Sequence, residues 1–416
     1  MGCTLAPSYE NRLLTLLFMT VGFVFFDRLA LSFLFPFMSA ELKLTHAQLG
    51  MASSVLSLTW ALSGTLAGAW SDARGRRKSL LVAAVVGFSF FSAASGLIGG
   101  FAGLLAFRAF MGIAEGPVLP ISQSLMIDSS SPARRGLNMG LLQGSSAGLL
   151  GAMIGPPVVV HIAMTYGWRQ AFYLSCIPGV LIAAAIWRWV RELPRDDQAV
   201  AKPAARIRYR TLLLHRNVML CTLISCLFVT WFVVIVSFAP SFLIEAKHYT
   251  AAQMSLVMSC LGAAWVIWGF AVPALSDRIG RKPAMVIFAL ISACCPVAFM
   301  HVASPLALGL LMLATYTGLG CFTLFMSTIP AETVPPAAMA STLGLIMGVG
   351  ELIGGFIAPT AAGFAADRYG LFVTMWIAAG GALLAGVASM FLIETAPAAL
   401  ARRRQVLTQF VQQSDA

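Results

Sequence analysis

Long apolar runs follow one another along nearly the whole chain and are separated by short polar segments. Each run is close to the ~20 residues that a helix needs to cross the hydrocarbon core of a bilayer. Membrane strands alternate polar and apolar positions, and these runs do not. The pattern predicts an all-α integral membrane protein with twelve transmembrane helices, at residues 13–39, 48–70, 79–98, 101–127, 137–161, 170–190, 217–244, 252–275, 284–302, 305–330, 340–366 and 371–393.

The composition excludes a soluble enzyme with a single core. Of the 416 residues, 59% are hydrophobic and only 10% are charged, whereas a soluble domain carries about 25% charged residues. Single soluble cores stop growing near ~250–300 residues. A lipid bilayer is therefore the solvent that this chain requires.

The net charge of +11 arises mainly from one set of alternate loops. Cytoplasmic loops carry an excess of Lys and Arg, so both termini are expected in the cytoplasm. Nucleic acid is not expected as a partner, and the short loops favour a bacterial inner membrane. The basic loop residues are Arg74, Arg76, Arg77, Lys78, Arg134, Arg135, Arg278, Arg281, Lys282 and those of 191–216 and 402–404.

The chain is predicted to contain two similar halves. Its longest polar interruption lies near the midpoint, which gives six helices in 1–190, a cytoplasmic linker at 191–216, six helices in 217–400 and a tail at 401–416. The sequence SDARGRRK at 71–78 recurs as SDRIGRK at 276–282, and the Tyr-Gly pair at 166–167 recurs at 369–370. Parallel repeats with a substrate site between them are a transporter design.

The duplicated loop resembles the signature of the major facilitator superfamily. Its first copy reads Gly68-x-x-x-Asp72-x-x-Gly75-Arg76-Arg77-Lys78, and its second copy has Pro273 in place of the first glycine. The resemblance covers the whole chain and implies the major facilitator fold, with two pseudo-symmetric six-helix halves that alternate access to a central site.

Two further stretches resemble the anion:cation symporter family. The first span carries Asp27-Arg28-Leu29-Ala30-Leu31-Ser32, and the fourth carries Arg108-x-x-x-Gly112-Ile113-Ala114-Glu115-Gly116-Pro117. The resemblance implies uptake of a small organic anion, such as a monocarboxylate, sugar acid or aromatic acid, by symport with protons.

Charged side chains in the middle of spans are the main functional candidates. Asp27, Arg28 and Glu115 each cost at least ~2.5–3.5 kcal/mol at the bilayer centre, so they are expected to face a partner or a water-filled cavity. A guanidinium offers a planar fork to a carboxylate, so Arg28 is the predicted substrate anchor. The alternative is a permanent structural pair of Arg28 with Asp27 or Glu115.

Asp27 and Glu115 are the predicted proton carriers. Burial and a nearby cation act in opposite directions on a carboxyl group, so its protonation can follow changes in solvent access. The resemblance implies the same roles for these two positions. Arg108 opens the fourth span near its outer side, where it is expected either to hold the helix of Glu115 or to assist proton transfer.

Glu351 lies in the middle of the eleventh span, where the first half has about Gly148. It is a candidate for proton coupling and for substrate binding, through substrate hydroxyls or a substrate amine, and its alternative is a protonated bridge between helices. Trp231, Tyr316 and Gln143 are further candidate substrate contacts, together with Trp60, Ser146 and Thr317. Polar and aromatic residues within spans often only pack or hydrogen-bond to neighbouring helices.

The duplicated loops are predicted to act as a gate. An acid at a helix end near guanidinium groups can form a latch between the halves on the cytoplasmic side. The gating candidates are Gly68, Asp72, Gly75, Arg76, Arg108, Asp277, Gly280 and Arg281. The simpler alternative is that the basic residues only fix the orientation in the membrane.

No nucleotide loop, nucleophile elbow or metal-binding histidine pair is present in the sequence, and the eight cysteines have no metal-ligand spacing. No metal or cofactor is therefore predicted, and one chain is expected to suffice. A proton-driven exporter of drugs is the first alternative, since Gly151-x-x-x-Gly155-Pro156 loosely matches the glycine-proline motif of such exporters. Arg28 would repel cationic drugs, which argues against this alternative. A receptor or scaffold would not need charges at the centre of its spans, which argues against that class of protein.

Overall fold

The computed structural model describes residues 7–74, 76–131, 134–192, 212, 215–397 and 399–400; at 7, 8, 68–74, 336, 337 and 340 it describes the backbone only. Every regular element within these ranges is helical. Twelve segments of the described chain are long and apolar enough to cross a membrane. The predicted all-α architecture with twelve spans is therefore confirmed.

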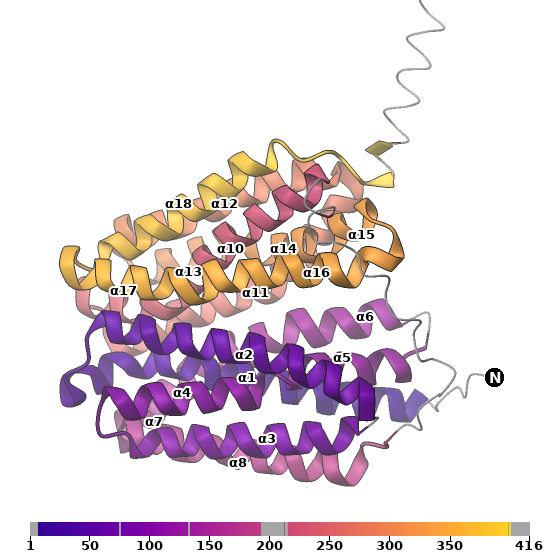
Figure 1. Cartoon of the computed structure of the whole chain (residues 1–416). Helices are drawn as coiled ribbons and strands as arrows, with labels where there is room; N and C mark the ends of the chain where they lie inside the picture. Colours follow the sequence, from indigo (N-terminus) through magenta and orange to yellow (C-terminus); the bar gives the residue numbers. More distant parts are fainter. Residues whose placement is uncertain are drawn as a thin grey trace, which may run out of the picture.

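The helices of the first half lie together on one side of the molecule, and those of the second half lie on the other (Figure 1). The first half contains α1 (Pro7–Leu42), α2 (His46–Arg74), α3 (Arg77–Ala94), η1 (Ser95–Leu97), α4 (Phe101–Glu115), α5 (Val118–Ser129), α6 (Arg135–Gly140), η2 (Leu141–Ser145), η3 (Ala147–Ile154), α7 (Gly155–Tyr166) and α8 (Trp168–Trp189).

The second half repeats this order of long and broken helices. Most of the predicted domain boundary, at 191–216, lies outside the described residues, so it stays a prediction. The second half contains α10 (Arg216–Ser241), η5 (Phe242–Ala246), α11 (Ala251–Ile279), α12 (Arg281–His301), α13 (Pro305–Thr315), α14 (Gly318–Thr323), η6 (Leu324–Thr328), α15 (Ile329–Thr333), α16 (Pro336–Gly350), η7 (Glu351–Ile357), α17 (Ala358–Tyr369) and α18 (Phe372–Ser389).

Backbone conformation shows the repeat between the halves directly. Lys43 and His248, at equivalent turns, both have positive φ angles, of 51° and 56°. Gly167 and Gly370, in the repeated Tyr-Gly pairs, have φ angles of 90° and 84°. Glycine is the residue that adopts this conformation without steric cost, which accounts for its recurrence.

The helix that follows each first turn begins with the same capping box. Thr45 and Gln48 exchange side chain to backbone hydrogen bonds at the start of α2. Thr250 and Gln253 do the same at the start of α11. Such a box satisfies two of the backbone donors that a helix start leaves free, so the two halves begin their second spans in the same way.

The halves pack most closely at one end, which we call the distal end because it is opposite the start of α1. There α2 packs on α17, and α11 packs on η3 and α7. A Cβ built on Gly50 would lie 2.1 Å from the Pro359 oxygen, and one on Gly262 would lie 2.2 Å from the Ala152 carbonyl carbon. Only glycine permits this contact between the two halves.

The fourth and tenth spans are present as predicted, and each contains a short interruption that the sequence did not predict. Helix α4 ends at Glu115 and α5 begins at Val118, because Pro117 has no N–H with which to continue the helical ladder. In the tenth span, Tyr316 (φ −79°, ψ 50°) separates α13 from α14. Interrupted helices of this kind place backbone groups and side chains at binding sites of transporters.

Candidate functional site

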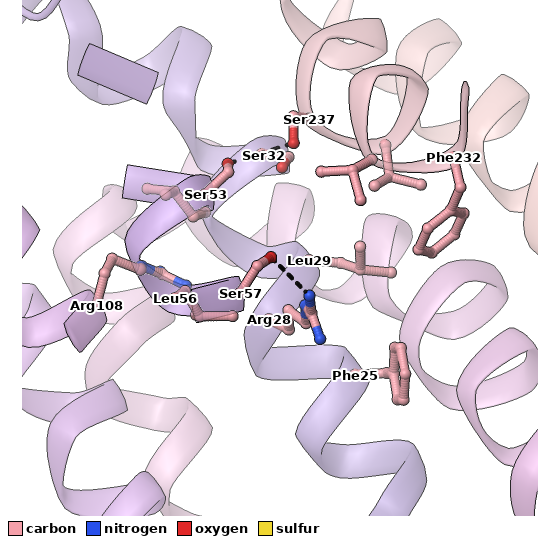
Figure 2. Close-up of a pocket in the computed structure, with 13 residues that line it drawn as sticks. Phe25, Arg28, Leu29, Ser32, Ser53, Leu56, Ser57, Arg108, Phe232 and Ser237 are labelled. Carbon is pink, nitrogen blue, oxygen red and sulfur yellow. Dashed lines mark hydrogen bonds between the residues drawn. The ribbon is translucent and has the colours of Figure 1, made fainter. Parts of the chain in front are cut away.

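A pocket lies between the two halves, between α1, α2, α4 and α10 (Figure 2). It combines two arginines and several serine hydroxyls with apolar and aromatic side chains. Its lining residues are Phe25, Arg28, Leu29, Leu31, Ser32, Ser53, Leu56, Ser57, Arg108, Phe232, Val233, Val236 and Ser237.

The guanidinium of Arg28 points into this pocket. One of its nitrogens, Nη2, donates a hydrogen bond of 2.9 Å to Ser57 Oγ on α2. The ring of Trp60 lies 5.2 Å from Arg28 Cζ, and the ring of Phe25 lies 6.0 Å away. Among the described residues Arg28 forms no ion pair, so the alternative of a structural pair with Asp27 or Glu115 is not seen and donors remain for a ligand.

Asp27 faces the interior of the first half. It is fully buried, and Oδ1 accepts a hydrogen bond of 2.9 Å from Ser92 Oγ on α3. Ser92 is in turn 2.7 Å from the Ser175 hydroxyl of α8. The second oxygen, Oδ2, has no hydrogen-bond partner in the described structure, so this carboxyl group has an open position for a proton.

Arg108 and Glu115 are buried beside Asp27. The exposed fraction is 1% for Arg108 and zero for Glu115, and neither side chain has a hydrogen-bond partner among the described residues. Arg108 is within electrostatic range of Glu115, Asp27 and Arg28. Two arginines and two carboxyl groups therefore form one charge cluster, and Arg108 belongs to it although it stands near the start of its span, Phe101–Ser129.

Glu351 approaches this cluster from the second half. It begins η7, and its Oε2 is buried without a partner in the described structure. A Cβ built on Gly355 would lie 2.3 Å from Glu351 Oε2 and 3.4 Å from Ser57 Cβ. Glu351 thus lies next to the serine that binds Arg28, and the charges of Glu351 and Arg28 interact.

Of the predicted substrate contacts, only Arg28 lines this pocket; Trp231, Tyr316, Gln143 and Glu351 do not. Trp231 and Tyr316 are fully buried in the second half, with ring centroids 4.8 Å apart. Trp231 Nε1 and the Tyr316 hydroxyl both lack hydrogen-bond partners within the described part of the chain. Gln143 is exposed. Phe228 and Tyr316 pack against the Trp231 indole.

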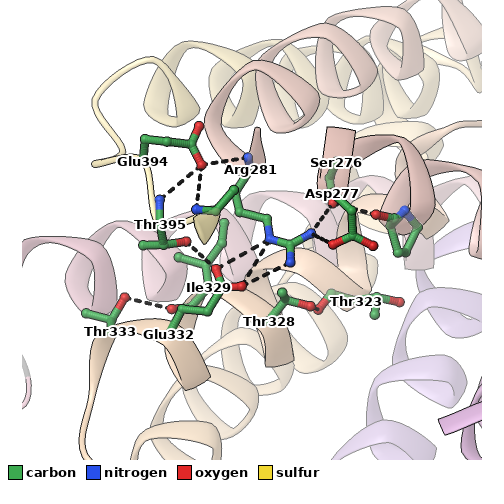
Figure 3. Close-up of polar contacts among 12 residues, drawn as sticks. Ser276, Asp277, Arg281, Thr323, Thr328, Ile329, Glu332, Thr333, Glu394 and Thr395 are labelled. Atoms are coloured by element: carbon green, nitrogen blue, oxygen red, sulfur yellow. Dashed lines mark hydrogen bonds and ion pairs between the residues drawn. The ribbon is translucent and has the colours of Figure 1, made fainter. Parts of the chain in front are cut away.

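The second-half copy of the repeated loop is bound within its own half (Figure 3). Arg281 is 2.6 Å from Asp277 and 3.0 Å from Glu332, and its Nη1 donates to Ser276. Glu394 accepts the backbone N–H of Arg281 at 2.8 Å. In this conformation Asp277 and Arg281 join α11, α12 and α15 within the second half, so the predicted latch between the halves stays a prediction.

Gly280 has the backbone conformation that its position requires. Its φ angle is 107°, and a Cβ there would lie 2.5 Å from Glu394 Oε2. In the first half, Arg77 is paired with Asp128, and Glu192 accepts the backbone N–H of Lys78 at 3.0 Å. Of the other gating candidates, Arg76 is exposed, and Gly75 lies outside the described residues. For Gly68 and Asp72 the structure describes the backbone only.

The sequence did not single out the serines of the site. Ser57 binds Arg28, while Ser92 and Ser175 form the hydrogen-bonded pair beside Asp27. Serines within apolar spans are common, so only the three-dimensional packing distinguishes these three. Within the described ranges no group of three or more potential metal ligands occurs.

The fold and the family comparison together define the class of protein, which is a membrane transporter and not an enzyme. Residues 17–359 match the family model of the Major Facilitator Superfamily. The chain belongs to this superfamily.

Several curated relatives are similar over nearly the full length. The hexuronate transporter of Bacillus subtilis (strain 168) is 26% identical, over 92% of this chain and 94% of the relative. The probable L-galactonate transporter of Escherichia coli (strain K12) is 24% identical, over 90% of this chain and 88% of the relative.

Solved structures of low sequence identity share the fold. A bacterial homologue of the human lysosomal transporter Spinster, in an inward-facing and occupied conformation, has a TM-score of 0.77 at 18% identity and covers 92% of this chain and 97% of its own. A D-xylose–proton symporter has a TM-score of 0.74 at 18% identity, over 93% of this chain and 99% of its own.

Proposed function

We propose that this transporter takes up a small organic anion, a monocarboxylate such as a sugar acid or aromatic acid, by symport with protons. The observation that carries the proposal is the guanidinium of Arg28, which lines a pocket between the halves and has a neutral serine as its hydrogen-bond partner. The names of the relatives, hexuronate and probable L-galactonate transporter, denote carboxylates and support the same class of substrate.

Arg28 is suited to bind the carboxylate. An arginine presents parallel N–H donors to both oxygens of a carboxylate, and such charge-assisted pairs are roughly twice as strong as neutral hydrogen bonds. The rings of Phe25 and Trp60 fix the direction of the guanidinium through contacts with its face. A bound carboxylate then replaces water and leaves the Ser57 hydrogen bond in place.

Asp27 and Glu115 are suited to carry the protons. Both carboxyl groups are buried with free oxygens beside Arg28 and Arg108. Binding of an anion favours protonation of Asp27 and Glu115, because the substrate then supplies the negative charge that balances Arg28 and Arg108. Loss of the protons restores carboxylates near the arginines and favours release of the substrate.

The packing of the halves supports alternating access. Glycines hold the distal end closed through contacts between α2 and α17 and between α11 and η3. With both termini in the cytoplasm of a bacterial inner membrane, this is the outer end, and rocking of the halves about the pocket exposes it to either side. A single chain contains the whole pocket, so a monomer is the proposed working unit.

Proteoliposomes with an inward proton gradient test the proposal. Sugar acids, aromatic acids and short monocarboxylates are screened for accumulation with the wild type, Arg28→Lys and Arg12→Lys. Arg12 is an exposed arginine on the same helix, so its variant controls for loss of an arginine on α1. Accumulation that is lost in Arg28→Lys and retained in Arg12→Lys supports the assignment.

The two carboxyl groups are tested by separating exchange from accumulation. Asp27→Asn and Glu115→Gln are expected to exchange labelled for unlabelled substrate across the membrane while no longer concentrating it. If both variants concentrate substrate normally, these groups do not carry the protons. If no anion moves and lipophilic cations are expelled instead, the protein is an exporter and Arg28 has a structural role.

A further inference from the structure

Glu351 is an acidic group in the second half that lies within electrostatic range of Arg28, the proposed anion-binding residue of the first half. Glu351 begins η7 directly after Gly350, and the next turn of this helix carries Gly354 and Gly355. Because Gly355 has no side chain, the carboxyl group of Glu351 lies over this turn, where a Cβ would be 2.3 Å from Oε2. The same Cβ position is 3.4 Å from Ser57 Cβ on α2.

This geometry places the carboxyl group near Ser57, the serine that is also the hydrogen-bond partner of Arg28. Ser57 Oγ accepts its 2.9 Å hydrogen bond from Arg28 Nη2, and Glu351 and Arg28 interact electrostatically. One oxygen of Glu351 is buried without a donor in the described structure. A buried carboxyl oxygen without a donor is costly, and it is stabilised when a ligand supplies one.

The repeat shows that this acidic group belongs to one half only. The equivalent position in the first half is near Gly148, which packs against Trp265 and Val266 of α11. Helix packing therefore does not require a carboxyl group at this point of the fold. The neighbours Leu352 and Ile353 are exposed on the outer face of the same helix, at 48% and 41%, as expected for side chains that contact lipid.

We propose that Glu351 selects substrates that carry one carboxylate and, at the other end, a hydrogen-bond donor such as a hydroxyl or ammonium group. Arg28 binds the carboxylate and Glu351 accepts a hydrogen bond from the donor, so the substrate bridges the two halves. A second carboxylate at the far end is repelled by Glu351, and an apolar end leaves its buried oxygen unpaired. This selectivity rests on the proposed anion transport and adds the class of anion.

Two matched series of probes test this selectivity by competition for binding to the purified protein. The six-carbon series is gluconate, 6-aminohexanoate, hexanoate and glucarate, and the three-carbon series is 3-hydroxypropionate, β-alanine, propionate and malonate. In at least one series the wild type is expected to bind the donor-bearing monocarboxylates roughly 10- to 100-fold more tightly than the donor-free and dicarboxylate members, as for hydrogen bonds to charged groups.

Substitutions at Glu351 assign the effect to this side chain. Glu351→Gln is expected to bind the dicarboxylate at least about tenfold more tightly relative to the monocarboxylate, because the repulsion is removed. Glu351→Asp retains the charge and is expected to keep rejecting dicarboxylates. Leu352→Ala, on the lipid-facing side of the same turn, is expected to match the wild type and controls for disturbance of η7.

Three results overturn the proposal. The wild type binds gluconate no better than hexanoate and 3-hydroxypropionate no better than propionate; it binds neither series; or the ratios are unchanged in Glu351→Gln. Failure of this proposal is distinguishable from failure of the anion-transport function. In the first case Arg28-dependent uptake of organic acids remains without discrimination between the probes. In the second, uptake of organic acids is absent or does not depend on Arg28.

Discussion

His46 of α2 and Asp367 of α17 join the two halves of the transporter at the distal end. The Asp367 carboxylate accepts the backbone N–H of His46 at 2.9 Å and that of Ala47 at 3.0 Å. The His46 ring is 3.2 Å from the same carboxylate and 3.0 Å from Glu245 at the end of η5. An acid from one half thus caps a helix of the other, and we call His46, Glu245 and Asp367 the distal clasp.

Neutralising Asp367 is expected to weaken the closed distal end. Asp367→Asn removes a charge at the N-terminus of α2 and one acceptor for its first N–H groups, which together contribute ~1–2 kcal/mol. A Ser54→Cys/Thr360→Cys pair reports closure, since these hydroxyls are 2.7 Å apart across the halves. Disulfide formation is expected to slow about tenfold in Asp367→Asn.

Glu41→Gln is the control for this experiment. Glu41 accepts hydrogen bonds from Trp168 and Arg169 within its own half, so its neutralisation changes charge near the distal end without breaking contact between the halves. Equal rates of crosslinking in wild type and Asp367→Asn would show that the clasp does not stabilise closure.

The clasp is also expected to respond to pH. Only the protonated imidazole of His46 donates hydrogen bonds from both ring nitrogens, one to Glu245 and one to Asp367. Disulfide formation itself becomes faster as pH rises, because the thiolate is the reactive form, so the wild-type rate is divided by the rate of His46→Gln at the same pH. This ratio is expected to fall as the pH rises and His46 loses its proton, and a ratio that does not change with pH would mean that His46 does not control closure.

Gly50 is expected to be required for closure of the distal end. A Cβ at this position would lie 2.1 Å from the Pro359 oxygen, and a backbone atom cannot move aside as a flexible side chain can. Gly50→Ala is therefore expected to hold the halves apart, with little crosslinking of the Ser54→Cys/Thr360→Cys pair and loss of uptake. Gly380→Ala, where a Cβ would meet nothing within 4 Å, is expected to behave as the wild type.

The sequence predicted the fold because the bilayer imposes its own pattern on the chain. Twelve long apolar runs and a repeated loop leave little choice of architecture. The breaks at Pro117 and Tyr316 were missed, since a hydropathy pattern does not record where the helical ladder is interrupted. The matching capping boxes at Thr45 and Thr250 carry a sequence signal that a search for the repeat would detect.

The central charges were also predictable, because Asp27, Arg28 and Glu115 are costly within apolar spans. Their arrangement was not. Sequence gave no means to decide that Arg28 binds Ser57 and that Arg108 joins the same cluster, since these contacts depend on how α1, α2 and α4 rotate against each other. The partners of Arg281 were not predictable for the same reason, since Glu332 and Ser276 approach it only through the packing of α11, α12 and α15.

The network around Arg281 is expected to stabilise the second half. Glu332 binds the Arg281 guanidinium at 3.0 Å and is itself mostly buried, at 22% side-chain exposure, whereas Asp277 is 65% exposed. Exposed pairs contribute ~0–1 kcal/mol, and breaking buried pairs costs more. Glu332→Gln is therefore expected to lower the melting temperature by several degrees more than Asp277→Asn, as measured in detergent. The reverse order would show that exposure does not govern these two pairs.

Arg108 and Glu115 are expected to show strong energetic coupling. Removing one buried charge leaves the other uncompensated, so Arg108→Gln and Glu115→Gln should each destabilise the protein. The double variant removes both charges and should cost less than the sum, with a coupling free energy of ~1–3 kcal/mol from thermal unfolding. The control is Arg108→Gln combined with Glu332→Gln. Glu332 lies in α15 of the second half, so the effects of these two substitutions should be additive. Additivity of Arg108→Gln and Glu115→Gln would mean that Asp27 alone balances the charge of Arg108. Glu115 would then be protonated and neutral in the folded protein, and its protonation would not depend on Arg108.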